Sequence, residues 1–322
     1  MNGLDLTRYN HFLSRPTKGW EVTDLTADEA VEHFIRESLS EYTRNAYRSE
    51  LAHFADWGGE LPASAVLVAR YLADHADMLA PSSLARRVAT LSKVHEANAW
   101  PNPCRSEIVR ATMRGIKRVN GTVQDQARPL LREDLFILLN ALGDDPRAKR
   151  DRALLLIGWA GGFRSSELVG LDLPDIEEVR EGLALHLRRS KTDQTGQGRK
   201  IGIPLGRTRH CPVAALSAWL GVLASDHGPI FRPVDRHGNV QPDRLRSDAV
   251  STILRNRLAN GGIDPEGYSG HSLRAGLATS AIKAGVPTYK VRAQTGHASD
   301  LMLSRYVRDA GLFDGNAAGA LL

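Results

Sequence analysis

The sequence predicts a mainly α-helical protein of two domains that carries one small antiparallel β-sheet. Between residues 26 and 120 the apolar residues recur at helical spacing, and no segment alternates as a strand does. Residues 183–189 and 201–205 do alternate, and the polar stretch between them is typical of a hairpin turn. These observations favour a helical N-terminal domain followed by an α+β domain.

The N-terminal region contains the clearest amphipathic helices. A helix from Ser40 places Leu51 and Phe54 on one apolar stripe. Further helices are expected around residues 64–77, from Pro81, where proline suits a first helical turn, and over about 105–119.

The chain divides into four parts on these patterns. Residues 1–23 resemble a loose arm, residues 24–120 form the helical domain, and residues 131–322 form the second domain. Residues 121–130 are polar, include Gly and Pro and lack an apolar period, so they are expected to be an interdomain linker.

Composition excludes several classes of protein. No apolar run is long enough to cross a bilayer, and the charged first twenty residues do not resemble a secretory signal, so no membrane association is expected. Cys104 and Cys211 have no metal-like spacing, which fits a reducing, cytoplasmic compartment and predicts no metal site.

Positive charge is unevenly distributed along the chain. The net charge is +5, yet residues 1–60 hold 6 Lys/Arg against 11 Asp/Glu. Residues 81–118 hold 8 basic and 2 acidic residues on two expected helices. A basic stripe at helical spacing can follow a phosphate backbone, so a nucleic-acid partner is indicated. The alternative is a solvated charged face without a partner.

Four local patterns carry residues suited to phosphate chemistry. The patterns are Gly161-Gly162-Phe163-Arg164 with Glu167, Lys191 in the hairpin turn, His271-Ser272-Leu273-Arg274, and Gln294-Thr295-Gly296-His297 followed by Tyr306. Each also has an ordinary structural explanation, which is, in the same order, a salt bridge within a helix, a solvated lysine in a turn, polar residues at the start of a helix, and a packed tyrosine.

The order and spacing of these patterns resemble the tyrosine recombinase (phage-integrase) family, in its Cre- and Xer-like form. Arg164 and Glu167 match the family's first arginine and the acidic residue three positions on. Lys191 matches the hairpin lysine, and His271 with Arg274 the H-x-x-R pair. The remaining matches are His297, at a position that is His or Trp in the family, and Tyr306, nine residues later, at the nucleophile.

The resemblance implies a site-specific DNA recombinase in which Tyr306 attacks a phosphodiester to give a 3′-phosphotyrosine, followed by strand exchange and religation. Arginines suit this role because guanidinium stays charged and binds phosphate with two donors. The family uses no metal, no ATP and no other cofactor, and the sequence lacks a G-x-x-x-x-G-K-[ST] phosphate loop. Lys191 is the expected acid for the leaving oxygen, and Glu167 is expected to orient its neighbours.

The resemblance also implies partners and an assembly. A core-binding domain and a catalytic domain would form a C-shaped clamp on double-stranded DNA with paired inverted-repeat half-sites. The expected assembly is a homo-tetramer on DNA, in which residues 311–322 of one protomer dock on a neighbouring protomer. The protein is expected to be associated with the nucleoid and to be encoded by a mobile element. The expected DNA-contact residues are Arg44, Arg48, Arg86, Arg87, Lys93, Arg110, Arg114, Lys117 and Arg118.

Other classes of protein remain open. A DNA-relaxing topoisomerase of the tyrosine type and a hairpin telomere resolvase share the chemistry, and supercoil relaxation without site preference would favour the first. A non-catalytic DNA-binding protein with the same fold would leave no covalent adduct on a nicked suicide substrate.

Overall fold

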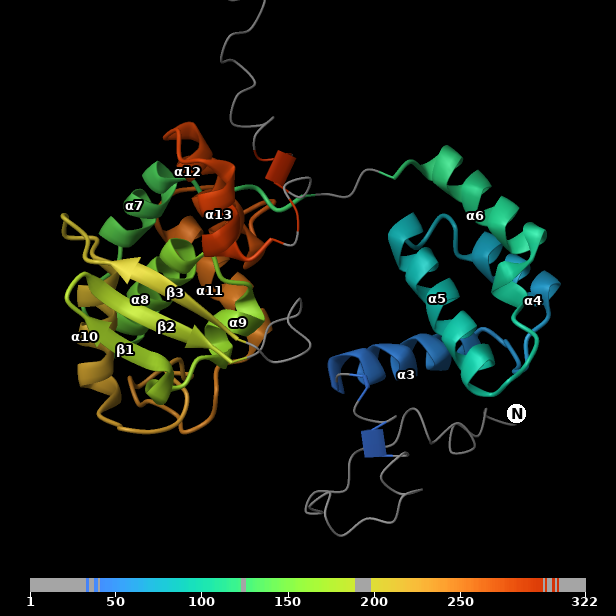
Figure 1. Ribbon diagram of the computed structural model, residues 1–322, viewed down its shortest axis with the longest axis horizontal. Helices are drawn as coiled ribbons and strands as arrows, with labels where there is room; N and C mark the ends of the chain where they lie inside the picture. The colour runs from blue at the N-terminus through green and yellow to red at the C-terminus, as the bar shows by residue number, and fades with distance from the viewer. Residues whose placement is uncertain are drawn as a thin grey trace, which may run out of the picture. The chain divides into compact units, whose positions relative to one another are not determined.

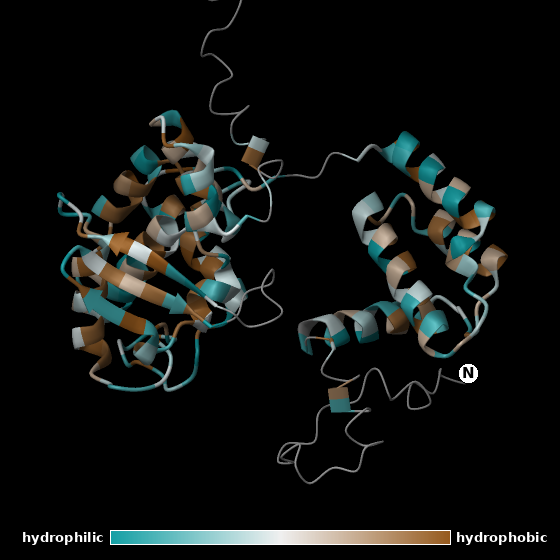
Figure 2. Ribbon diagram, in the orientation of Figure 1, coloured by the Kyte–Doolittle hydropathy of each residue, from teal (hydrophilic) through white to brown (hydrophobic). Residues whose placement is uncertain are grey.

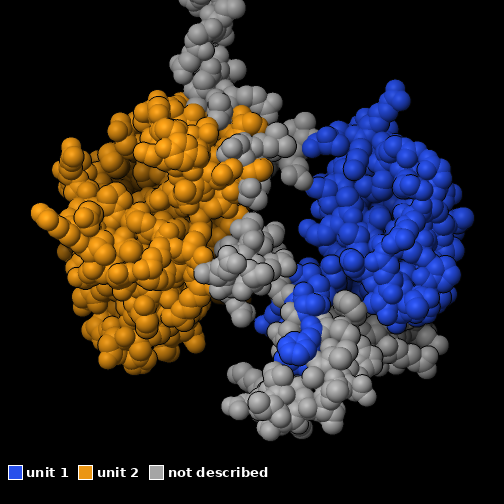
Figure 3. Space-filling model, in the orientation of Figure 1, with its two compact units in different colours: residues 1–124 blue, residues 125–322 orange. Residues whose placement is uncertain are grey.

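The computed structural model of the chain describes residues 33–34, 38–39, 41–122, 126–188, 198–297, 299, 303–304 and 306. The chain divides between Gln124 and Asp125 into two compact units, unit 1 over residues 1–124 and unit 2 over residues 125–322 (Figure 3). This division lies within the segment expected to be a linker. The predicted arm over residues 1–23, Lys191 and the segment 311–322 lie outside the described residues.

Unit 1 is helical over its described residues (Figure 1). Ser64 begins one helix because its hydroxyl accepts a hydrogen bond from the Leu67 amide at 3.2 Å, and Pro81 lies in the first turn of another. The helices match the four predicted positions. They are α3 (Glu41–Asp56), α4 (Ala65–Asp74), α5 (Pro81–Ala97) and α6 (Glu107–Asn120), with the 3-10 turn η3 (Pro103–Arg105) before α6.

The core of unit 1 is the stripe that the sequence predicts. Leu84 and Leu91 of α5 are buried against Leu51 and Phe54 of α3. Helices α5 and α6 each carry both apolar and polar residues, as expected of helices with one buried face (Figure 2). Burial of these apolar side chains is the main favourable contribution to the stability of the unit.

In unit 2 helices pack against one face of a small sheet (Figure 1). No helix in the described parts of either unit combines the length and apolarity needed to span a bilayer. The elements of unit 2 are α7 (Arg132–Asn140), α8 (Pro146–Gly161), α9 (Ser165–Gly170), η4 (Leu173–Asp175), β1 (Ile176–Val179), β2 (Gly182–Leu187), β3 (Arg199–Pro204), α10 (Pro212–Leu223), α11 (Ser247–Asn260), α12 (His271–Lys283) and α13 (Thr288–Thr295).

The sheet contains the predicted hairpin and one additional strand. Its order is β1-β2-β3, all antiparallel, with Leu185 opposite both Ile176 and Ile201. Sequence reasoning did not find β1, because only its first residue faces the core while Glu177 and Glu178 are exposed. An edge strand with charged residues lacks the apolar alternation that identifies a strand.

Helix α8 is the centre of unit 2. Its residues Leu154, Leu155 and Ile157 are fully buried, and the helix packs against α10, α12 and β3. Trp219 of α10 is also fully buried, and its indole donates to the Ile230 carbonyl at 2.8 Å. This rigid helix leads directly into the turn that carries the first residue of the candidate site.

The first residues of unit 2 are held against the start of α12. The amide of Arg128 donates to Gly267 O at 2.8 Å, and the amide of Leu130 donates to Ser272 O at 3.0 Å. The Leu130 carbonyl accepts from the indole of Trp159 at 2.9 Å. A side chain at Gly276 would overlap this carbonyl, so glycine lets the entering chain lie directly on α12.

Candidate active site

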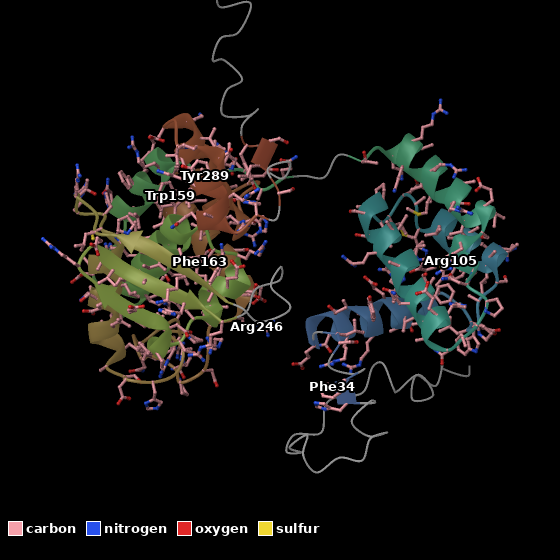
Figure 4. The ribbon with its side chains drawn as sticks, in the orientation of Figure 1. Phe34, Arg105, Trp159, Phe163, Arg246 and Tyr289 are labelled. Carbon is pink, nitrogen blue, oxygen red and sulfur yellow. The ribbon has the colours of Figure 1, made fainter. Side chains whose placement is uncertain are left out.

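A tight turn between α8 and α9 presents Arg164. Helix α8 ends at Gly161, and Gly162 adopts a left-handed conformation with φ of +59°. A side chain at Gly161 would overlap the ring of Phe163, which is buried. Figure 4 labels the position of Phe163 in unit 2. The Gly-Gly-Phe sequence therefore reverses the chain directly before Arg164.

Glu167 fixes the position of Arg164 through two hydrogen bonds. Its Oε2 accepts from the backbone amide of Arg164 at 2.9 Å, and its Oε1 accepts from Arg164 Nη1 at 2.5 Å. Only 2% of the Glu167 side chain is exposed, so water screens this pair little. The salt bridge that the i, i+3 spacing suggested is present, and it anchors the guanidinium from a buried position.

Arg274 of α12 is buried and only partly hydrogen-bonded. Its Nη1 donates to Gly162 O at 2.9 Å and to Thr295 O. Its Nη2 is buried and has no hydrogen-bond partner among the described residues. Burial and the nearby positive charge of Arg164 lower the pKa of Arg274 to about 10, so the guanidinium remains charged at neutral pH. A buried donor without a partner favours the binding of an anion.

His271 begins α12 beside the start of α9. A side chain at Gly270 would overlap the hydroxyl of Ser165, the first residue of α9. The amide of Gly270 also donates to Ser251 Oγ of α11 at 2.9 Å. His271 is exposed at this junction and lies on the same helix as Arg274. The turn that presents Arg164 and the start of the H-x-x-R helix therefore meet.

His297 is buried and oriented by Thr295. Thr295 Oγ1 lies 2.6 Å from Val291 O and 2.7 Å from His297 Nδ1. The hydroxyl donates its single proton to the carbonyl, so it accepts from Nδ1–H, and Nε2 becomes the acceptor nitrogen of the neutral ring.

Tyr306 lies next to His297. The ring centroids of the two residues are 5.9 Å apart, with an angle of 58° between the ring planes. Tyr306 also packs on a small cluster of Ala278, Val291 and Leu303. The alternative of a packed tyrosine is thus partly correct, because the ring is supported on one side and faces an imidazole on another.

The pKa of His297 is lowered by burial and by several positively charged neighbours. Burial is the main cause that lowers the pKa of His297 to about 3, and the positive charges of Arg274, Arg164, His271 and Arg199 lower it further. The ring is therefore neutral over the physiological range. The described predicted residues gathered around this centre are Arg164, Glu167, His271, Arg274, His297 and Tyr306.

Two contributors were missed by sequence reasoning. Thr295 belongs to a quoted motif but was given no role, and Arg199 was not singled out at all. Arg199 Nη2 lies 3.5 Å from Glu167 Oε2, and its Nη1 lies 3.2 Å from Gln294 O. Thr295 acts through Val291 and His297, which lie close to it in the chain, but the motif does not show that its hydroxyl binds the imidazole. The contacts of Arg199 join residues far apart in the chain, and only its place just after the polar turn could have suggested it.

Two of the predicted DNA-contact residues point into unit 1. Arg44 is only 4% exposed and donates to Leu39 O at 2.9 Å. Arg87 Nη1 donates to the hydroxyl of Tyr71 at 2.7 Å, while its Nε is buried and has no hydrogen-bond partner among the described residues. These two guanidinium groups are bound within the unit, so we do not retain them as proposed contacts to DNA.

The other predicted contact residues are at least partly accessible. Arg86 pairs with the buried Glu50 while most of its side chain remains exposed, and Lys93 pairs with Glu96 at 3.3 Å. Arg110 and Arg114 both approach Glu107, an exposed residue. The accessible predicted residues are Arg48, Arg86, Lys93, Arg110, Arg114, Lys117 and Arg118.

The described residues contain no group of three His, Cys, Asp or Glu side chains arranged to hold a metal ion.

Comparisons with known proteins concern the family and the fold of the chain. The model of the phage integrase family matches residues 129–311. The chain is 34% identical over 293 residues to an integrase/recombinase xerD homolog of Selenomonas ruminantium, covering 88% of this chain and 86% of that relative. It is 25% identical over 316 residues to the recombinase cre of Escherichia phage P1, covering 89% and 91%. A lambda integrase tetramer bound to a Holliday junction has a similar fold, with a TM-score of 0.63 at 19% identity, covering 95% of this chain and 77% of that chain.

Proposed function

Because this chain belongs to the phage integrase family of tyrosine recombinases, we propose that Tyr306 attacks a DNA phosphodiester and forms a covalent 3′-phosphotyrosine. The Tyr306 Oη–phosphorus bond forms as the bond from phosphorus to the 5′ oxygen breaks. Strand exchange and religation then follow by attack of a 5′ hydroxyl on the phosphotyrosine. The ester conserves the energy of the broken bond, so no ATP is needed, and the guanidinium groups of Arg164 and Arg274 take the charge-stabilising role that a metal ion has in other enzymes.

One observation carries this proposal: the buried Nη2 of Arg274 has no hydrogen-bond partner in the described part of the chain, and Arg274 lies close enough to Arg164 and Tyr306 to interact with their charges. Two guanidinium groups at one place suit a phosphate whose non-bridging oxygens gain negative charge during the attack. They are already ordered by Glu167, Gly162 O and Thr295 O, so little reorganisation is needed when phosphate binds.

Proton transfers require an acceptor for the phenol and a donor for the leaving oxygen. His297 is neutral and presents Nε2 as an acceptor in the tautomer that Thr295 selects, beside the Tyr306 ring. His271, at the start of α12, is the second imidazole of the site and is proposed to take part in proton transfer. We assign protonation of the 5′ oxygen to Lys191 on the strength of its family match.

The proposed substrate is double-stranded DNA with paired inverted-repeat half-sites. One solved protein of similar fold, a lambda integrase, forms a tetramer bound to a Holliday junction, which supports our proposal of a homo-tetramer here. Unit 1 offers the exposed basic residues Lys93, Arg110, Lys117 and Arg118 on two helices. We propose that these side chains contact phosphates and that residues 311–322 join neighbouring protomers.

A nicked suicide substrate tests the proposal. Once the short fragment that carries the new 5′ hydroxyl diffuses away, an active enzyme remains attached to the 3′ end of the cut strand and migrates as a denaturation-resistant adduct. We expect this adduct with the wild-type protein in the presence of EDTA and without ATP, and its loss in Tyr306→Phe with half-site binding retained. Binding without any adduct would identify a non-catalytic DNA-binding protein. Relaxation of supercoils without site preference would identify a topoisomerase.

A further inference from the structure

Arg199 is a partly buried guanidinium that the proposed chemistry does not use. It is the first residue of β3, and 22% of its side chain is exposed. Burial lowers its pKa, and the nearby Glu167 carboxylate opposes that shift. A charged side chain that is mostly withdrawn from water requires compensating partners.

The partners of Arg199 include the last carbonyl groups of α13. Its Nη1 lies 3.2 Å from Gln294 O and 3.5 Å from Ala293 O. The last carbonyls of a helix receive no hydrogen bond from the helix itself, and the C-terminal end of a helix carries partial negative charge. A guanidinium there caps the helix.

Arg274 caps the next carbonyl of the same helix end. It donates to Thr295 O and to Gly162 O. Arg199 and Arg274 therefore donate to two successive carbonyls, those of residues 294 and 295, and Arg199 also lies near the carbonyl of residue 293. His297 follows two residues later, so its backbone leaves a helix end that is held by two cations.

Gly296 provides the space that this arrangement needs. A side chain on Gly296 would overlap the guanidinium of Arg199, which lies against this turn. The residue also adopts a left-handed conformation, with φ of +67°. Both the left-handed backbone and the nearby Arg199 guanidinium therefore favour glycine between the capped helix and His297.

Arg199 also approaches the carboxylate that holds Arg164. Glu167 Oε2 lies 3.5 Å from Arg199 Nη2, while both oxygens of Glu167 bind Arg164. The 3.5 Å separation is long for a hydrogen bond, so this contact is mainly an attraction between charges. It joins the α8–α9 turn to β3 and to the end of α13.

We propose that Arg199 is a positioning residue for strand cleavage: it caps α13 beside Arg274 and braces Glu167, and so fixes His297 and Arg164 relative to each other. The inference rests on the proposed function, because it needs a cleavage reaction in which these two residues act. Arg199 itself need not touch DNA in this role.

The test compares three variants in single-turnover cleavage of the suicide substrate. Arg199→Gln should lower the rate of adduct formation by about 100-fold, as a small misplacement of catalytic groups does, with little change in half-site affinity. Arg199→Lys keeps the charge without the planar fork and should fall between Gln and wild type. Lys200→Gln is the matched control, because this adjacent residue pairs with Glu177 at 3.0 Å on the exposed side of the sheet, and it should behave as wild type.

A double mutant separates positioning from a general structural role. If Arg199 acts partly through Glu167, then Arg199→Gln combined with Glu167→Gln should cost less than the product of the two single effects. Removal of the Arg199 charge should also raise the pKa of His297, measured by NMR titration of its ring.

Several results would overturn the inference. Wild-type cleavage by folded Arg199→Gln would do so, as would a rate loss matched by an equal loss of half-site affinity, which would make Arg199 a DNA contact. If Arg199→Gln does not fold, Arg199→Lys decides, and full activity in that variant would mean that charge alone suffices. Failure of the wild-type protein to form an adduct would instead reject the proposed function.

Discussion

The hydroxyl of Thr295 determines which nitrogen of His297 carries the hydrogen. The hydroxyl proton is given to Val291 O, 2.6 Å away, and the Nδ1–H of His297 is accepted at 2.7 Å. Nε2 is consequently the basic nitrogen of the neutral ring. A buried side chain that forms no part of the expected catalytic set therefore controls the chemistry of one that does.

Thr295→Val should impair both stability and cleavage. Valine keeps the shape but leaves the buried Nδ1–H without its acceptor, which costs about 1–3 kcal/mol of folding free energy or shifts the ring to the other tautomer. Denaturant unfolding and single-turnover adduct formation measure the two effects. Thr295→Ser, which retains the hydroxyl, should stay close to wild type, and equal behaviour of the two variants would contradict this account.

His297 should make the protein less stable in acid. Its pKa is about 3 in the folded protein, whereas an unfolded chain titrates His near about 6.5. Between these values the unfolded chain binds more protons, so the contribution of neutral His297 is fully present above about pH 6.5 and is lost as the pH falls toward about 3.

The contribution of one histidine is isolated by a variant. The difference in unfolding free energy between wild type and His297→Gln should be constant above about pH 7 and should change steadily from about pH 6 to about pH 4. Parallel curves over this range would show that His297 is not buried in its neutral form. Other titrating groups, such as His53, are present in both proteins and cancel in the difference.

Arg274→Lys should abolish most cleavage although it preserves the charge. Nη1 already serves Gly162 O and Thr295 O, while Nη2 is the donor left for phosphate. One ammonium cannot reach all three positions in this geometry. We expect a decrease of about 100-fold to about 1000-fold in single-turnover adduct formation, the usual effect of losing one charge-stabilising donor. A rate near that of wild type would show that the phosphate does not bind at Nη2.

Two basic residues of unit 1 should respond in opposite ways. Lys117 is exposed, so Lys117→Ala should reduce the salt dependence of DNA binding by about one unit of slope and leave stability unchanged. Arg87 instead donates to Tyr71 Oη at 2.7 Å, so Arg87→Met should destabilise unit 1 by about 1–3 kcal/mol without changing that slope. Salt titrations of half-site binding and thermal unfolding distinguish them, and exchanged outcomes would invalidate the assignment.

The elements that the sequence predicts correctly depend on local periodicity. Leu84, Leu91 and Val94 recur on one helical face, and all three are buried in the core of unit 1. Strands β2 and β3 alternate because one face of the hairpin packs on the helices. Strand β1 was not predictable in this way, since Glu177 and Glu178 leave no apolar pattern.

The candidate site was predictable as far as its residues lie in short motifs. Arg164 with Glu167, and His271 with Arg274, are separated by three positions each, so one local pattern contains both members. The orientation of Arg87 toward Tyr71 and of Arg199 toward α13 depends instead on how separate elements pack. No spacing along the chain encodes these contacts, and a basic residue looks the same in the sequence whether it faces solvent or a carbonyl.

The attachment of Leu130 has a practical consequence for dividing the molecule. A fragment that begins at residue 126 keeps the backbone hydrogen bonds to Gly267, before α12, and to Ser272, in its first turn. It also keeps the Leu130 carbonyl that accepts from the indole of Trp159. A truncation at residue 131 removes those bonds and leaves the indole donor unpaired, next to the bare backbone of Gly276. Dissection of this enzyme should therefore preserve residues 126–130, because Arg128 and Leu130 bind the start of the helix that carries Arg274 and the loop before it.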